Sequence, residues 1–367
     1  MFEFFELILN SAILWVYLQA IVLLLISALY DFAVPWIIWV SFVLMTALCF
    51  VRNPSPQPNI TDKILGLDPI SLGKKNDVSD LCNSDGNKEE PYCMRAVAHR
   101  GGGYDYPENS ISAFRNSKQK GCTAVEFDVA LTKDNIPIVY HDVTIERLTG
   151  QIGVIREMTW DQLKELDITY NHPLRDKFRS GEKIALLEDV LEECIKNDQR
   201  IFMDIKEKSL DIVQIILNMY KKYPKLFERA IVTSFNPIVI YMIRRKEPRV
   251  VCSLSWRPFV FSRKSYSSLD GPGAVRFNNP LKHIAAWTLD VIHSWALPRF
   301  TYYLLGLSVI LLHKDIVSAE VVRQWHKRGV RVIVWTINLP SEKLHFSRLL
   351  KVTYLTDTLL TESNGHL

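Results

Sequence analysis

Two long apolar runs lie at the start of the chain. Residues 7–30 and 32–51 contain no charged side chain, and only Asp31 separates them. In helical form, each run is long enough to cross a hydrocarbon core of about 30 Å. Because Asp31 and Pro35 mark a break, the pattern predicts for residues 1–52 a tight helical hairpin, or one transmembrane helix followed by an interfacial segment. No basic residue precedes the first run, and it is too long for a signal peptide, so we expect a retained membrane anchor.

The pattern changes twice after this anchor. Residues 53–94 are rich in Pro, Asn, Asp, Ser and Lys, which predicts a linker or a surface wrap with too little apolar material for a core. Over residues 95–367, short β-branched runs alternate with helical periodicity. The size and rhythm are typical of a catalytic (β/α)₈ TIM barrel, although alternation alone also allows a doubly wound open sheet. A small β-hairpin insertion is expected to turn at Asp134-Asn135 and to return over 136–141. The expected barrel strands are 96–99, 124–129, 201–206, 230–234, 250–254, 307–313, 331–336 and 352–356, and helical patterns cover 111–120, 186–195, 210–220 and 319–328.

An apolar insertion, residues 256–305, separates two of these strands and is longer than a barrel crossover needs. Its second half is rich in Trp, Leu, Ile and Tyr. In helical projection His283 and Asp290 fall on one side, and Trp287 and Val291 fall on another. This pattern predicts a membrane-facing interfacial helix beside the mouth of the barrel. A helix that only covers the outer wall of the barrel is the alternative.

Polar side chains gather where the expected strands end. In a parallel barrel these ends meet at one face, so we expect the side chains to lie close together. Three carboxylates at one mouth repel one another unless a hard divalent cation holds them, and two cationic side chains beside them could grip a phosphate. The residues are His99 and Arg100 at the end of the first strand, Glu126 and Asp128 on the second, His141 at the end of the hairpin, and Asp204 and Lys206 on the third.

Each of these residues also has a purely structural interpretation when it is taken alone. A carboxylate pair on a strand is usually solvated, and a His that ends a strand is more often a hydrogen-bonded structural group than a catalyst. Asn109 is better interpreted as a helix N-cap than as a catalytic group. Trp335 ends a later strand, where it fits core packing as well as a platform for substrate. The coincidence of three strands that are polar at the same end favours a site.

Charge excludes one class of partner. The chain has 44 basic and 40 acidic residues, a net charge of +4, and residues 1–51 contain no Lys or Arg. This excess is too small to suggest nucleic acid as a partner. It is compatible with an anionic small substrate or an anionic membrane surface.

In combination, the motifs resemble the glycerophosphodiester phosphodiesterase family over nearly all of residues 95–360. Two positions depart from that family: Asp204 stands where most members have Glu, and Asn135 stands where the hairpin turn usually has Gly. Asn tolerates a positive φ, so the hairpin is expected to form. The motifs are Ala98-His99-Arg100-Gly101-Gly102, Pro107-Glu108-Asn109-Ser110, Val125-Glu126-Phe127-Asp128-Val129, Pro137-Ile138-Val139-Tyr140-His141-Asp142, Asp204-Ile205-Lys206, Thr233-Ser234-Phe235, Trp335-Thr336-Ile337-Asn338 and Thr356-Asp357.

The resemblance implies roles for the strand-end residues. It makes His99 and His141 an acid/base pair, and it implies one divalent cation, Mg²⁺ first and Ca²⁺ as the alternative. The expected reaction is the hydrolysis of small glycerophosphodiesters, such as glycerophosphoinositol, to glycerol 3-phosphate and an alcohol. Family precedent favours attack by the glycerol 2-hydroxyl and a cyclic phosphate that water then opens. The metal ligands would be Glu126, Asp128 and Asp204, and the substrate contacts would be Arg100, Lys206 and Trp335.

Two other functions remain open from the sequence. With the same site, a membrane-bound enzyme could act as a lysophospholipase D on lysophospholipids or N-acyl lysophospholipids. An inactive membrane scaffold would be expected to have lost one of the carboxylates or histidines, and none is lost.

The side of the membrane receives conflicting signals. Arg52 and Lys63 follow the second apolar run and weakly favour a cytosolic barrel. Asn59-Ile60-Thr61 is a glycosylation sequon, and Cys82 and Cys93 could close a disulfide in an oxidising compartment. We expect an integral protein of the plasma membrane or of endomembrane vesicles, with its catalytic domain lumenal or extracellular.

Overall fold

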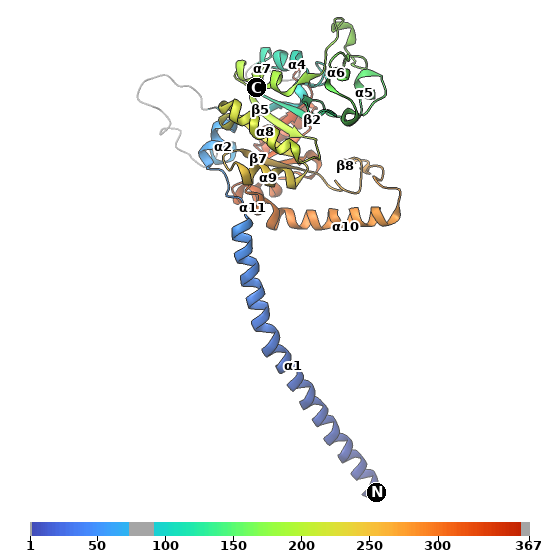
Figure 1. Ribbon diagram of the computed structural model, residues 1–367. Coiled ribbons are helices and arrows are strands. Elements are labelled where there is room, and N and C mark those ends of the chain that lie inside the picture. Colours follow the sequence, from blue (N-terminus) through green and yellow to red (C-terminus); the bar gives the residue numbers. More distant parts are fainter. Residues whose placement is uncertain (1, 73–91, 361–367) are drawn as a thin grey trace, which may run out of the picture. The chain divides into compact units, whose positions relative to one another are not determined.

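A computed structural model describes residues 2–72 and 92–360, and the chain divides into two units between Arg52 and Asn53. The first unit is one helix, α1 (Phe2–Val51), with Pro35 in its interior (Figure 1). The expected break near Asp31 is therefore wrong, and α1 is continuous. An interior proline removes one backbone hydrogen bond and bends a helix, but an apolar helix can absorb this defect. By length and composition, Leu14–Val51 could cross a membrane.

The second unit is built on a closed barrel of parallel strands, as the sequence predicts. Strand β12 pairs with β1 and β1 pairs with β2, which closes the barrel and excludes the open doubly wound sheet. In order around the barrel the strands are β1 (Ala96–Ala98), β2 (Ala124–Leu131), β5 (Arg200–Ile205), β6 (Ala230–Ser234), β7 (Val251–Trp256), β10 (Val309–His313), β11 (Arg331–Trp335) and β12 (Thr353–Thr356).

Helices surround the barrel, and the four helical patterns found in the sequence form as α4, α7, α8 and α12. Their apolar faces pack against the outer sides of the strands in one continuous core. The helices of eight or more residues in this unit are α2 (Pro58–Leu65), α4 (Ile111–Gln119), α7 (Leu187–Lys196), α8 (Asp211–Lys222), α9 (Pro237–Lys246), α10 (Pro280–Ala296) and α12 (Ala319–Lys327). Shorter ones are α3 (Pro69–Leu72), α5 (Glu146–Thr149), α6 (Trp160–Leu163), α11 (Tyr302–Leu305) and α13 (Pro340–Leu344), and the 3₁₀ and π segments are η2 (His99–Gly101), η3 (Ile155–Glu157), η4 (Arg175–Lys177), η5 (Pro224–Glu228), η6 (Leu297–Thr301), η7 (Lys314–Ile316) and η8 (His345–Leu349).

Alternation along β2 decides which side chains reach the inside of the barrel. Val125 and Phe127 belong to the outer core under the helices, whereas Ala124 belongs to a second core with one or two residues from each barrel strand. Successive side chains of a strand point to opposite faces. Glu126 and Asp128 therefore share the inner face with Ala124 and lie nearer the end of the strand.

The predicted hairpin insertion is confirmed. Strand β3 (Pro137–Val139) pairs antiparallel with β2, and β4 (Ala185–Leu186) pairs antiparallel with β3. At the turn, Asn135 has φ 59°. Asn is among the few residues that adopt this left-handed conformation readily, so the replacement of Gly is accommodated.

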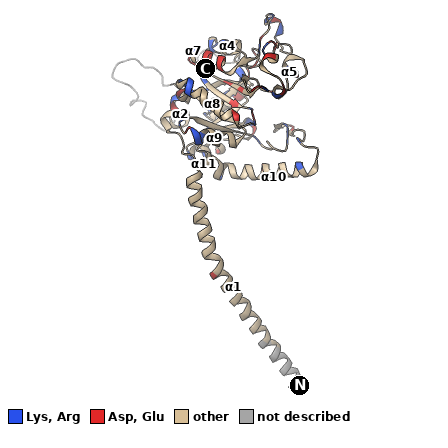
Figure 2. Ribbon diagram, viewed as in Figure 1, with Lys and Arg blue, Asp and Glu red and all other residues tan. Residues whose placement is uncertain are grey.

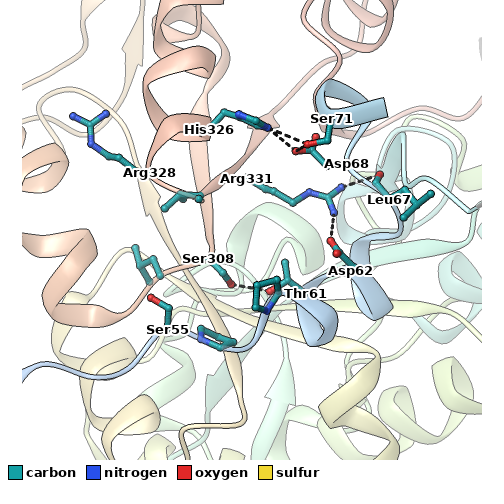
Figure 3. Close-up of a pocket in the computed structure, with 15 residues that line it drawn as sticks. Ser55, Thr61, Asp62, Leu67, Asp68, Ser71, Ser308, His326, Arg328 and Arg331 are labelled. Carbon is teal, nitrogen blue, oxygen red and sulfur yellow. Dashed lines mark hydrogen bonds and ion pairs between the residues drawn. The ribbon is translucent and has the colours of Figure 1, made fainter. Parts of the chain in front are cut away.

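The described part of the segment that follows α1 packs on the floor of the barrel (Figure 3). Ile64 and Leu65 are fully buried in the inner core. His326 Nε2 lies 2.9 Å from Asp68 Oδ2, and Arg331 donates a hydrogen bond of 2.6 Å to the carbonyl of Gly66. A cavity of about 580 Å³ lies between this segment and the starts of β10 and β11. It is at the end of the barrel that usually serves stability. Cys82, and with it the suggested pairing with Cys93, lies outside the described residues.

The insertion after β7 carries its apolar side chains outward. It contains the short strands β8 (Tyr266–Ser267) and β9 (Gly271–Pro272), then α10, which projects from the barrel (Figure 1) and has few charged residues (Figure 2). Ala286 and Asp290 are buried, whereas Trp287 is 51% and Trp295 is 54% exposed. A helix that merely covered the barrel would bury its aromatic side and expose its charge. The orientation of α10 is the reverse.

Candidate active site

Three carboxylates meet inside the barrel at the ends of β2 and β5. The register pairs Asp128 directly with Asp204, and Glu126 lies two residues before Asp128 on the same face. One oxygen from each of the three lies within 4.8 Å of the others, and all three residues are buried. The predicted metal-site carboxylates are thus brought together as a set of oxygen donors, the chemistry that Mg²⁺ and Ca²⁺ prefer. This donor set fits one hard divalent cation.

Two cations partly balance the carboxylates. Lys206 Nζ is paired with Asp204 and lies 3.1 Å from Asp128 Oδ1, and Arg100 Nε lies 3.3 Å from Asp128 Oδ2. Burial would raise the pKa of Asp128, but Lys206 and Arg100 hold it well below its usual range. Burial and the Asp128 carboxylate instead raise the pKa of Glu126 to about 8. The three clustered carboxylates thus outnumber Lys206 and Arg100, the two cations paired with them, so a bound cation would contribute most among these carboxylates.

His99 is held by a chain of hydrogen bonds from the neighbouring strands. Its Nδ1 lies 2.5 Å from Asp357 Oδ1, at the end of β12, and its Nε2 lies 3.8 Å from Glu126 Oε2. Asn338 donates a 2.8 Å hydrogen bond to the other oxygen of Asp357. Burial alone would lower the pKa of His99, but the Glu126 and Asp357 carboxylates outweigh it and raise the pKa above its usual value.

His141 has a similar arrangement in a more open place. Its Nδ1 lies 2.6 Å from Asp142 Oδ1, and Arg147 Nε donates a 2.5 Å hydrogen bond to Asp142 Oδ2. Arg147 also binds both oxygens of Glu108, at 2.7 and 2.8 Å. Glu108 accepts a 3.0 Å hydrogen bond from Arg100. A continuous chain of ion pairs and hydrogen bonds therefore connects His141 with Arg100, a predicted phosphate contact.

The interpretation of Asn109 as a helix cap is wrong. Ser110 caps α4 instead, because its side chain accepts a hydrogen bond from the backbone of Ala113 at 3.1 Å. Asn109 has φ 60° and is buried, and its amide donates to Asp128 Oδ2 at 2.8 Å. It therefore positions one of the three carboxylates.

Both histidines, both cations and two of the three carboxylates line one cavity of about 270 Å³. Trp335 forms part of its wall and packs edge to face against Phe235, with ring centroids 5.6 Å apart. The indole nitrogen of Trp335 is buried and has no hydrogen-bond partner among the described residues. Trp335 thus packs in the wall of the cavity, and its indole donor stays buried. The lining residues are His99, Arg100, Glu126, His141, Asp204, Lys206, Phe235, Ser255, Arg257, Leu311, Trp335, Thr336 and Leu355.

Sequence reasoning found the central groups but assigned no role to several that support them. Asp357, Asn338 and Arg257 all follow barrel strands, so their place at strand ends was the available signal. Arg257 is buried, lines the cavity and donates hydrogen bonds to the carbonyls of its own loop. Its role could not be inferred without the path of that loop.

Comparison with known proteins defines the class. The chain belongs to the glycerophosphoryl diester phosphodiesterase family, whose model matches residues 99–360. It is 34% identical over 273 residues to glycerophosphodiester phosphodiesterase 1 of Homo sapiens, which covers 74% of this chain and 80% of the human protein. The protein is thus an enzyme of this family, a phosphoric diester hydrolase that acts on glycerophosphodiesters.

The chain is also similar to more distant proteins. A lysophospholipase D of Mus musculus is 24% identical over 254 residues, which covers 68% of this chain and 74% of the mouse protein. The solved structure of an Oleispira antarctica phosphodiesterase in complex with its product sn-glycerol-3-phosphate has a TM-score of 0.55 at 19% identity, and covers 72% of this chain and 92% of that one.

Proposed function

We propose that the protein hydrolyses small glycerophosphodiesters, such as glycerophosphoinositol, to glycerol 3-phosphate and an alcohol, with one divalent cation, Mg²⁺ before Ca²⁺. One observation carries this proposal. His99 and His141 line one cavity with Glu126, Asp204, Arg100 and Lys206, and one oxygen each of Glu126, Asp204 and Asp128 lies within 4.8 Å of the others. An inactive scaffold would not be expected to keep both histidines, both cations and all three carboxylates.

The two imidazoles would move the protons. Each has a carboxylate at Nδ1, which leaves Nε2 available to the substrate. One accepts the proton of the glycerol 2-hydroxyl as its oxygen attacks phosphorus, and the other donates a proton to the departing alcohol. Water then opens the cyclic phosphate at the oxygen on carbon 2, which leaves glycerol 3-phosphate.

The remaining residues would neutralise the phosphate. Arg100 and Lys206 offer N–H donors to the non-bridging oxygens, which otherwise repel a nucleophile. Glu126, Asp128 and Asp204 would hold the cation, and when bound it supplies further positive charge opposite the same oxygens. Trp335 offers its ring to the substrate at the wall of the cavity.

An assay of the full-length protein with glycerophosphoinositol tests this proposal. Release of glycerol 3-phosphate is expected with Mg²⁺ and is expected to stop in excess chelator. Asp204→Asn removes charge from the donor set and should raise the Mg²⁺ concentration for half-maximal rate by roughly tenfold or more. Asp211→Asn, on the exposed start of α8, is the matched control. Full turnover in excess chelator would contradict the proposal.

The same proposal includes the location of the enzyme. α1 is long and apolar enough to serve as a membrane anchor, and α10 exposes an apolar face that suits a bilayer interface. Asn59 of the sequon is exposed on the first turn of α2, where a glycan has room. These features support a membrane-anchored enzyme with a lumenal or extracellular barrel.

A further inference from the structure

Arg257 differs from the other cations in the wall of the active-site cavity. Arg100 and Lys206 both form ion pairs with Asp128. Arg257 directly follows β7, is only 8% exposed and forms no ion pair with any described residue. A charge that is taken out of water without a counterion is costly, and such groups gather at functional sites. Arg257 is therefore a positive charge in the wall without a counterion beside it.

Backbone carbonyls hold the guanidinium of Arg257 in place. Its two terminal nitrogens donate hydrogen bonds of 3.0 Å to the carbonyl of Pro258 and of 2.9 and 3.1 Å to those of Arg263 and Lys264. A longer one, of 3.4 Å, reaches the carbonyl of Phe259. The N–H on Nε has no hydrogen-bond partner among the described residues and is not sealed from solvent. Carbonyl dipoles orient a cation without cancelling its charge, so this N–H and the charge stay available to a ligand.

The insertion sets the shape of the loop that supplies these carbonyls. The buried carboxylate of Asp290 in α10 accepts hydrogen bonds from the backbone N–H groups of Phe261 and Ser262, at 2.8 and 2.9 Å. Phe259 has φ 56°, a left-handed conformation that is rare for an aromatic residue. Backbone strain of this kind persists only where surrounding contacts hold it, and it clusters at functional sites. The position of Arg257 is therefore set by the insertion as well as by β7.

Beyond the cavity, the same side chain borders a larger groove. Arg257 lines both hollows, and the groove has a volume of about 760 Å³, compared with about 270 Å³ for the cavity. Glu207 is the one acidic side chain among the described lining residues, and it pairs with Arg156 at 3.1 Å. Apolar side chains such as Phe261 form much of the wall, and they reduce the water that would screen a charge. The cations that line the groove are Lys206, Lys208, Arg257, Arg276 and Lys282.

We propose that Arg257 and this groove bind a second phosphate, carried by the head group of the substrate, while the diester phosphate lies at Arg100 and Lys206. The inference rests on the proposed function and names its preferred substrate class, glycerophosphodiesters whose departing alcohol is itself phosphorylated. The bond changes stay the same. The glycerol 2-hydroxyl oxygen bonds to phosphorus, the bond from phosphorus to the head-group oxygen breaks, and that oxygen leaves with one proton. The second phosphate departs intact on the alcohol, and water then opens the cyclic phosphate.

Charge and position favour this occupant. A phosphate monoester carries about 1.5 to 2 negative charges and three acceptor oxygens, so it suits several cations better than a carboxylate does. Arg257 borders both hollows, which places it between the diester site and the other cations of the groove. An anionic membrane surface would attract the exposed Lys208 and Lys282, but it would not reach a buried guanidinium. The buried charge therefore indicates a small anionic group that enters the groove.

Two substrates that differ by one phosphate test the inference. The value of kcat/KM is measured for glycerophosphoinositol and for glycerophosphoinositol 4-phosphate, with the full-length protein in a neutral detergent. A charge-assisted contact is expected to favour the phosphorylated substrate by roughly tenfold or more. Added salt should reduce this ratio, because screening weakens the attraction between the exposed lysines and the second phosphate.

Variants assign the preference to particular residues. Arg257→Met removes the charge and should lower the ratio by about tenfold, whereas Arg257→Lys keeps the charge and should retain more of the preference. Lys282→Met, at an exposed position in the first turn of α10, should lower the ratio by about two- to fivefold. Lys196→Met, at an exposed position of α7 outside the groove, is the matched control and should leave the ratio unchanged.

The outcomes separate this inference from the proposed function. Equal kcat/KM values for the two substrates, or a preference that survives both Arg257→Met and Lys282→Met, would overturn the head-group site. Faster cleavage of glycerophosphoinositol than of its 4-phosphate would also overturn it and leave the proposed function standing. Cleavage of neither substrate would reject the proposed function itself. If the melting temperature shows that Arg257→Met does not fold, Lys282→Met still decides, because its exposed side chain supports no core.

Discussion

The two imidazoles share one hydrogen-bonding arrangement but not one environment. Nδ1 of each faces a carboxylate, Asp357 for His99 and Asp142 for His141. A partner at Nδ1 fixes the tautomer and the ring orientation. The side chain of His99 is 15% exposed and that of His141 is 31% exposed, so His99 lies deeper in the mouth of the barrel. The two imidazole rings are therefore held in the same way, but His99 lies deeper in the barrel than His141.

Removal of either imidazole should stop the reaction without unfolding the barrel. We expect His99→Ala or His141→Ala to lower kcat for glycerophosphoinositol by about 10²–10⁴, the usual loss when a general acid or base is removed. The melting temperature should change little, because both side chains lie at strand ends and leave no cavity in the core. His345→Ala, at an exposed position of η8, is the matched control. Near wild-type turnover in either variant would exclude that His from catalysis.

At this scale the sequence identifies groups better than it identifies their partners. Strand-end position alone places Glu126 and Asp204 at one mouth, because the ends of parallel strands meet there. The contact between His99 and Asp357 joins residues 258 positions apart, and no local pattern encodes it. For Asn109, the local sequence suggested a role that the structure does not bear out. Asn109 and Ser110 are both good caps by residue type, and only the left-handed backbone of Asn109 decides between them.

Among the elements, α10 shows what periodicity can and cannot predict. Helical spacing groups Trp287 with Trp295 and opposes them to Asp290, and the structure confirms that grouping. The spacing does not tell which face the protein covers. Most surface helices bury their apolar stripe, whereas α10 uses Asp290 to bind the insertion loop and turns the tryptophans outward.

An exposed face of this kind should bind lipid. The second unit alone, residues 53–367, is expected to bind liposomes that contain anionic lipid, because α10 presents tryptophans at a spacing that suits an interface. Replacement of both Trp287 and Trp295 by Ser should weaken the partition coefficient by about tenfold or more, measured by co-sedimentation.

A control substitution separates membrane binding through α10 from nonspecific adsorption to lipid. Leu349→Ser is the control, because Leu349 is 74% exposed on η8 and its replacement removes exposed apolar surface outside α10. A fully soluble second unit that ignores liposomes would mean that α10 has another partner.

Other elements were predicted because their signals are strong. All eight barrel strands follow from short β-branched runs, and their ends differ from the expectation by only a few residues. The continuity of α1 through Pro35 was not predicted, because proline signals a helix end reliably only when water can solvate the freed backbone groups. In a long apolar helix the chain continues through it.

At the scale of the whole molecule, charge does not decide on which side of a membrane the barrel lies. α1 has no basic residue along its length, and the net charge of the chain is only +4 (Figure 2). Asn59 is exposed, and Thr61 of the same sequon is buried with its hydroxyl 3.1 Å from Ser308. A glycan at Asn59 would therefore need to be added before this segment packs on the barrel.

Glycosylation tests the lumenal assignment. We expect the full-length protein from eukaryotic cells to lose mass on treatment with an N-glycosidase, and Asn59→Gln to abolish that shift. Gln57→Asn creates no sequon and controls for effects of substitution in this segment. Reaction of Cys82 or Cys93 with a thiol reagent confined to the cytosol would place the barrel on the other side.

The pairing of Asp128 with Asp204 also determines which kinds of genetic change the enzyme can survive. A substitution in β2 or β5 alters one side chain, but the insertion or deletion of a single residue before Glu126 would turn that residue and Asp128 from the inner to the outer face. Two carboxylates would then lie under α4 without Lys206 or a cation. Surface loops between the barrel strands can change in length at little risk, while the lengths of these two strands are fixed. Related sequences should therefore differ in length mainly in their loops, and the spacing of the carboxylates along β2 and β5 should stay the same.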